Sequence, residues 1–176
     1  LLVAWFTVRR WRLGWSSFGF NRPASLASFL AVLYLAALGG ILIDQNGYGL
    51  LQGLPGYPAL GVIPRGDDPL WRWIDLTAGL FLVALSEEMV FRGYLFTVLS
   101  RCNLSAPWIV VAGAAAFGLI HWSGGLHQVL VTALAGALFM VLYIRTRSLP
   151  ALVLAHWIVD VVAFAEVMPA ILFRLM

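Results

Sequence analysis

The stretch LASFLAVLYLAALGGILI, residues 26–43, carries no charged side chain and is almost long enough to cross a bilayer by itself. A transmembrane helix needs about 20 predominantly apolar residues. The whole chain of 176 residues agrees with this, because 62% of its residues are hydrophobic and only 11% are charged, whereas soluble domains are roughly a quarter charged. We therefore predict an all-α fold, a polytopic integral membrane helix bundle that occupies the lipid bilayer.

Further apolar runs surround this stretch, and a chain of this length has room for about five to seven transmembrane helices and for no sizeable soluble domain. The stretch 44–69 is rich in glycine and proline, which indicates a loop. We expect one membrane domain over residues 1–176, with additional spans at 70–100, 106–122, 126–144 and 149–165.

Basic residues flank the apolar runs. If the helices alternate in direction, these residues lie on one side, which the positive-inside rule makes cytoplasmic. The net charge of +3 therefore reflects membrane topology, and we expect no nucleic-acid partner. We predict a protein of the cell membrane with a cytoplasmic N-terminus. The residues are Arg9, Arg10, Arg12, Arg22, Arg101, Arg145 and Arg147.

Six ionisable side chains lie inside these apolar runs. An Asp, Lys or Arg costs about 2.5–3.5 kcal/mol at the centre of a membrane helix, and an ionisable residue there is by default a candidate functional residue. The cost is bearable if the six converge in the interior of the bundle. Four of them form two pairs at helical i, i+4 spacing, so each pair shares a helix face. The six residues are Glu87, Glu88, Arg92, His121, His156 and Asp160.

Depth along the helices supports convergence for only part of this set. Glu87 and His121 both lie roughly 20–24 Å from the turn that joins their helices, whereas His156 lies only about 12 Å from its own turn. Tilted or offset helices must absorb that difference. Each of these residues also has a structural explanation when taken alone, such as a Glu88–Arg92 ion pair that joins two helices or a histidine that packs through a hydrogen bond.

With neutral histidines, three carboxylates and one arginine sum to a formal charge of −2, which a low-dielectric interior does not tolerate. A divalent cation or about two bound protons would compensate. Either would serve catalysis, since a metal polarises a carbonyl and a tuned carboxylate acts as a base. The lone Cys102 excludes an internal disulfide and a multi-cysteine metal site.

Three short motifs follow one another along the chain: EEMVFR at 87–92, FGLIH at 117–121 and HWIVD at 156–160. They resemble the EExxxR, FxxxH and HxxxN/D motifs of the CAAX-protease and bacteriocin-processing (CPBP, or Abi) family of intramembrane proteases. The turn RTRSL at 145–149 also resembles the RTGSL turn of that family, with Arg147 in place of glycine.

The resemblance implies a catalytic core over residues 70–165 and an intramembrane endopeptidase that hydrolyses a peptide bond of a membrane-associated or lipidated protein substrate. It implies that Glu87 acts as the general base on water and that His121 positions this water. Glu88 and Arg92 would brace the site.

The same resemblance implies that His156 and Asp160 stabilise the oxyanion of the tetrahedral intermediate, with Asp160 standing where relatives often have Asn. The family is labelled a metalloprotease family, so His121 and His156 would be the ligands if zinc (Zn²⁺) or another divalent cation binds. The chain lacks HExxH, the spacing that puts two zinc ligands and a base on one helix.

Two other classes of function compete with a protease. A proton- or ion-coupled transporter also uses intramembrane Asp, Glu and His, and it predicts inverted repeats or broken helices; the sequence shows no repeat. A non-catalytic membrane scaffold or immunity protein could retain the motifs. Cleavage of a candidate peptide, compared with the Glu87→Gln variant, separates the three.

Overall fold

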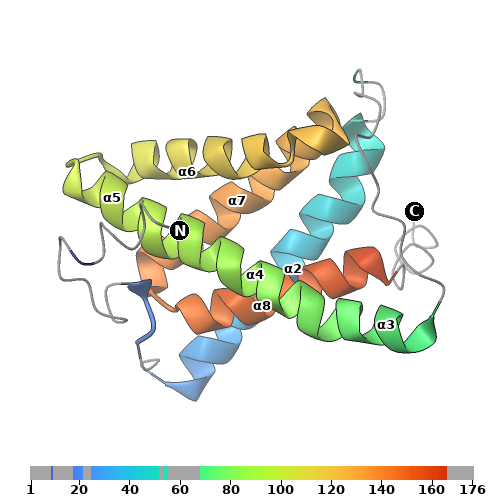
Figure 1. Cartoon of the computed structure of the whole chain (residues 1–176). Coiled ribbons are helices and arrows are strands. Elements are labelled where there is room, and N and C mark those ends of the chain that lie inside the picture. The colour runs from blue at the N-terminus through green and yellow to red at the C-terminus, as the bar shows by residue number, and fades with distance from the viewer. Residues whose placement is uncertain (1–8, 10–17, 22–24, 52–53, 55–67, 166–176) are drawn as a thin grey trace.

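The computed structural model describes residues 9, 18–21, 25–51, 54 and 68–165 (Figure 1). These residues are mainly helical, which confirms the all-α prediction. Two helices, Leu26–Gly47 and Leu126–Thr146, are long and apolar enough to cross a membrane. Three arginines of the predicted cytoplasmic side lie outside the described residues: Arg10, Arg12 and Arg22.

Helix α2 (Leu26–Leu51) contains the apolar stretch and continues beyond it. The sequence predicted a loop over 44–69, but residues 44–51 are helical, so the predicted start of the loop was wrong. Glycine does not end the helix there because Gly47 packs tightly: a Cβ at this position would lie 2.6 Å from a methyl group of Val131 on α7 (Leu126–Thr146). Residues 55–67 of the predicted loop lie outside the described residues.

The second apolar run forms one continuous helical path from Pro69 to Arg101, seen across the front of the molecule in Figure 1. Asp68 caps its start by accepting a hydrogen bond from the Leu70 amide at 2.8 Å. The path is roughly 50 Å long at 1.5 Å per residue, which exceeds a hydrocarbon core of about 30 Å and requires a tilt in a bilayer. Its parts are α3 (Pro69–Ile74), the π-helical η2 (Asp75–Gly79), α4 (Leu80–Glu88), the π-helical η3 (Met89–Leu95) and α5 (Phe96–Arg101).

The remaining helices pack behind this path. Helix α6 lies along α7, α2 packs against both α7 and α8, and α4 crosses α8. Small residues permit the close approach of α6 and α7, since a Cβ on Gly118 would lie 2.5 Å from the carbonyl oxygen of Val129. The bounds are α6 (Ala106–Ile120), the short 3₁₀ turn η4 (Trp122–Gly124), α7 (Leu126–Thr146) and α8 (Leu149–Phe164).

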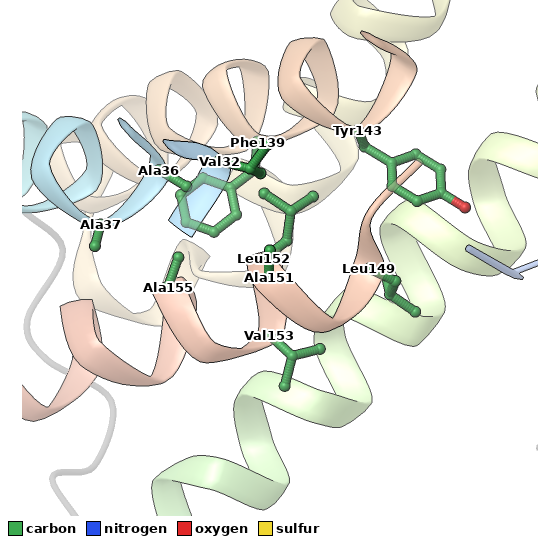
Figure 2. Close-up of a cluster of buried hydrophobic side chains, with 10 residues drawn as sticks. All are labelled: Val32, Ala36, Ala37, Phe139, Tyr143, Leu149, Ala151, Leu152, Val153 and Ala155. Carbon is green, nitrogen blue, oxygen red and sulfur yellow. The ribbon is translucent and has the colours of Figure 1, made fainter. Parts of the chain in front are cut away.

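The buried core lies where α2, α7 and α8 meet, as Figure 2 shows. Alanines such as Ala36 and Ala155 are fully buried at this junction, which lets the α2 and α8 backbones approach closely. Larger side chains from α7, Phe139 and Tyr143, fill the rest. The core thereby holds α8 in place at the level of His156, the residue that follows Ala155.

The turn before α8 explains how arginine replaces the glycine of the RTGSL pattern. Arg147 has φ 53°, the left-handed conformation that glycine adopts most easily. Its guanidinium lies 4.2 Å from the ring centroid of Phe96 and 4.8 Å from that of Tyr143. These cation–π contacts offset the backbone cost of the turn.

Large apolar side chains cover much of the outside of the bundle, including Leu30, Leu82 and Leu134. Only 28% of the apolar window in each of the two long helices is buried, so neither is the enclosed core helix of a soluble protein. Exposed tryptophans lie near helix ends, as interfacial tryptophans do; they are Trp71, Trp73, Trp108 and Trp122.

Candidate active site

A fully buried ion pair, Arg92 with Glu88, lies in the candidate site. Arg92 Nη1 donates to Glu88 Oε1 at 2.7 Å across one helical turn, and the two side chains are 1% and 0% exposed. Arg92 Nη2 also donates to the Gly136 carbonyl of α7 at 3.2 Å. The guanidinium lies 4.6 Å from the ring centroid of Phe117 and 5.2 Å from that of Phe139. Four contacts therefore compensate the buried cation.

His156 joins this pair from α8. Its Nδ1 lies 2.8 Å from Glu88 Oε1, and because a carboxylate only accepts, Nδ1 carries the proton and donates. The other ring nitrogen, Nε2, consequently faces two further carboxylates, Glu87 at 3.7 Å and Asp160 at 3.6 Å. Both distances exceed a direct hydrogen bond but lie within ion-pair range for a protonated imidazole. One imidazole thus links three acids from two crossing helices.

His121 lies at the C-terminal end of α6, where the helix stops and η4 begins. Its Nδ1 donates to the Phe117 carbonyl at 2.8 Å, which leaves Nε2 as an acceptor in the neutral ring. The Phe117 ring lies 4.9 Å from the His121 ring and 5.9 Å from the His156 ring, centroid to centroid. One aromatic side chain therefore packs against both histidines.

A cavity of about 440 Å³ adjoins these groups. The sequence predicted that Glu87, Glu88, His121, His156 and Asp160 line one interior cavity. The structure brings the last four together on its wall, with Arg92 beside them. Glu87 is not part of that wall. Its side chain is 21% exposed and approaches His156 Nε2 at 3.7 Å.

Four polar residues of this cavity were missed by the sequence reasoning: Asp44 and Gln45 of α2, and Gln128 and Thr132 of α7. Asp44 and Gln45 directly follow the uncharged apolar run 26–43, and that position is the signal that identifies them. The glycines and prolines that follow favour a loop from residue 44 onward, which conceals that signal.

A protein-family model described as "Type II CAAX prenyl endopeptidase Rce1-like" matches residues 69–162, more than half of the chain. The chain belongs to this family. Comparison with curated proteins and with solved structures finds no match. The Rce1-like match contains all three motifs and the turn before α8, whereas α2, with Asp44 and Gln45, lies outside it.

Membership of the Rce1-like family makes the chain a peptidase that acts on a membrane-associated protein substrate. Together with the exposed apolar helices, it indicates a membrane protein. Within the described part of the chain, no group of three or more His, Cys, Asp or Glu side chains is arranged to hold a metal ion. The donors that the structure describes therefore do not fit a zinc site, which uses three or four protein ligands.

Proposed function

We propose that this chain is an intramembrane endopeptidase that hydrolyses a peptide bond of a membrane-associated or lipidated protein, with Glu87 as the general base. The hydrolysis runs without a step through a metal ion. The proposal rests on the family and on the difference between the two adjacent glutamates of the site.

The observation that carries the proposal is a difference between the two glutamates. Glu88 is already hydrogen-bonded to Arg92 and His156, whereas Glu87 lies 3.7 Å from His156. Glu88 Oε1 already accepts from Arg92 and from His156, and the side chain is fully buried. Glu87 is partly exposed and faces His156 Nε2 across a gap of 3.7 Å. A base must reach water, and of the two side chains only that of Glu87 is exposed to it. Glu88 therefore braces His156, and Glu87 activates water.

In the proposed reaction, the Glu87 carboxylate takes a proton from water while the water oxygen attacks the carbonyl carbon of the scissile bond. The carbonyl electron pair moves to oxygen and forms the oxyanion. Collapse of this tetrahedral intermediate breaks the C–N bond, and the proton held by Glu87 passes to the leaving amine nitrogen. Glu87 returns to its carboxylate form, so protons and electrons balance.

His156 and Asp160 act on the oxyanion in this proposal. A protonated Nε2 of His156 donates to the oxyanion, and Glu88 holds the ring in the orientation that this requires. Asp160 lies one turn further along α8 and positions Nε2, at 3.6 Å. His121, whose Nδ1 is occupied by the Phe117 carbonyl, offers Nε2 to position the attacking water.

We further propose that α2, the path from Pro69 to Arg101, α6, α7 and α8 each cross the cell membrane, as part of a bundle of about five to seven spans. The alternation of these helices puts Arg101, Arg145 and Arg147 at one end. The positive-inside rule makes that end, and the N-terminus, cytoplasmic.

The test is cleavage by the purified protein in detergent, with a library of peptides that carry an apolar membrane anchor and with products read by mass spectrometry. Glu87→Gln should lower the cleavage rate by about 10²–10⁴-fold, since the amide keeps the shape but takes no proton. Asp75→Asn is the matched control, because Asp75 is an exposed acid on the same helical path, away from the cavity.

Near-wild-type cleavage by Glu87→Gln would move the base to another residue. Cleavage by neither the folded wild-type protein nor any variant would favour the non-catalytic scaffold. Unfolding of Glu87→Gln should match that of the wild-type protein, which separates loss of chemistry from loss of fold.

A further inference from the structure

Asp44 is an acidic residue of the cavity wall that the proposed reaction does not use. It lies on α2, outside the segment that matches the Rce1-like family. Gly40 and Gly47 lie at i−4 and i+3 from it, on the same helix face. A Cβ at Gly40 would lie 2.6 Å from Val159 of α8, and one at Gly47 would lie 2.6 Å from Val131 of α7. This face is therefore pressed against α7 and α8, and it directs Asp44 into the cavity.

No structural role accounts for Asp44. The residue lies in the interior of α2 and caps neither end of the helix. Its hydrogen bond comes from the neighbouring Gln45, whose Nε2 donates to Asp44 Oδ2 at 3.1 Å. In the part of the chain that the structure describes, no Arg or His lies within ion-pair distance of Asp44. An ionisable side chain in a membrane helix carries an insertion cost that function commonly explains.

Asp44 gives the cavity wall an excess of negative charge. The wall carries three acids, Asp44, Glu88 and Asp160, against one arginine, Arg92, and two histidines, His121 and His156. Arg92 is paired with Glu88, and His156 contacts both Glu88 and Asp160. Asp44 is the acid left over. A cationic ligand group next to Asp44 would therefore be stabilised, whereas an anionic group there would be repelled by an excess of negative charge.

The lining of the cavity suits a long cationic side chain. Apolar residues of α7 and α8 line it, among them Val131, Ala135 and Val159. The methylene stem of an arginine or lysine packs on such a surface while its charged end reaches a carboxylate. The amide of Gln45, beside Asp44, adds a polar group at the same end.

We propose that Asp44 is a specificity-determining residue that binds the cationic side chain of an arginine or lysine near the scissile bond of the substrate. This inference rests on the proposed function, because it assigns the substrate of the same cavity. It selects among peptides by charge and leaves the chemistry at Glu87 and His156 unchanged.

The experiment compares membrane-anchored, fluorescence-quenched peptides that differ at one position at a time on either side of the cleaved bond. Each position carries Arg, Lys, Gln or Glu. The wild-type protein should show a kcat/KM about 10- to 100-fold higher for Arg or Lys than for Gln at one position, as a charge-assisted contact provides. Glu at that position should be cleaved more slowly than Gln.

Variants at position 44 test the residue itself. Asp44→Asn should reduce the Arg-to-Gln preference to below about threefold, mainly by lowering kcat/KM for the Arg peptide. Asp44→Arg should reverse the preference in favour of Glu. Asp75→Asn should keep the wild-type preference. A merely structural role would lower cleavage of all peptides alike and would leave the ratio unmoved.

A wild-type protein that cleaves without charge preference, or an Asp44→Asn variant that keeps the preference, overturns this inference and leaves the proposed endopeptidase standing. A folded wild-type protein that cleaves no peptide overturns both.

Discussion

Replacing Glu88 by glutamine tests the idea that the site is organised by its buried ion pair. The substitution preserves the shape of the side chain and removes the charge that compensates Arg92. Removing one partner of a buried pair costs about 3–5 kcal/mol, because the other charge remains buried and uncompensated. The glutamine oxygen can still accept from Arg92 or His156, and the Gly136 carbonyl and two aromatic rings remain around the guanidinium. We therefore expect the lower end of that range, about 3 kcal/mol, or roughly a 100-fold change in the unfolding equilibrium.

The assay is reversible unfolding of the purified protein in mixed micelles, followed by far-UV circular dichroism. Arg92→Met and the double variant Glu88→Gln/Arg92→Met complete a double-mutant cycle. Methionine fills the space between Phe117 and Phe139 without a charge, so the double variant should be less destabilised than the sum of the two single variants by about 2 kcal/mol or more.

Two results would refute this reasoning. One is a Glu88→Gln protein within about 1 kcal/mol of the wild-type free energy of unfolding, which would mean that Arg92 needs no carboxylate. The other is additivity of the two substitutions, which would mean that the charges do not stabilise one another in the folded protein.

Three further predictions follow from the same geometry. Asp160→Asn should retain cleavage within about tenfold of wild type, whereas Asp160→Ala should lose about 100-fold or more, since Asn keeps a polar group beside His156. Chelator and added zinc should change neither rate. Recovery of either variant by zinc would contradict the metal-free role of Asp160. Arg147→Ala should be less stable than Arg147→Gly by about 1 kcal/mol in thermal unfolding, because both lose the cation–π contacts but only alanine keeps the left-handed backbone cost; equal stability would contradict a cost at φ 53°. Gly118→Ala should lower the free energy of unfolding by about 1–3 kcal/mol, since its Cβ meets a backbone carbonyl that cannot move aside. In the matched Gly79→Ala variant the Cβ meets the flexible side chain of Asp75, so its free energy of unfolding should lie within about 0.5 kcal/mol of wild type.

The sequence was sufficient for the features that depend on composition and on spacing within one helix. A chain with so few charges cannot form a soluble surface, so its class follows from composition. Glu88 and Arg92 pair at 2.7 Å, and Asp160 lies 3.6 Å from His156, because residues four apart on a helix share a face whatever surrounds that helix. Pro69, Pro107 and Pro150 likewise lie in the first turns of their helices, where proline is tolerated.

Relations between helices depend on offset and tilt, which no spacing along the chain contains. His156 was expected at a depth different from that of Glu87, yet it meets both glutamates, because α8 crosses α4 and the buried alanines beside it allow close approach. The same crossing gives the two adjacent glutamates different environments. Glu88 is buried against Arg92 and His156, whereas Glu87 lies at the edge of the site.

The end of α2 is the clearest case in which tertiary packing determines where a helix ends. Glycine, asparagine and aspartate over 44–49 favour a break in an isolated chain. The helix continues because Gly47 fits against Val131 of α7, a contact between residues far apart in the sequence. Only that packing turns Asp44 from a predicted loop residue into part of the cavity wall.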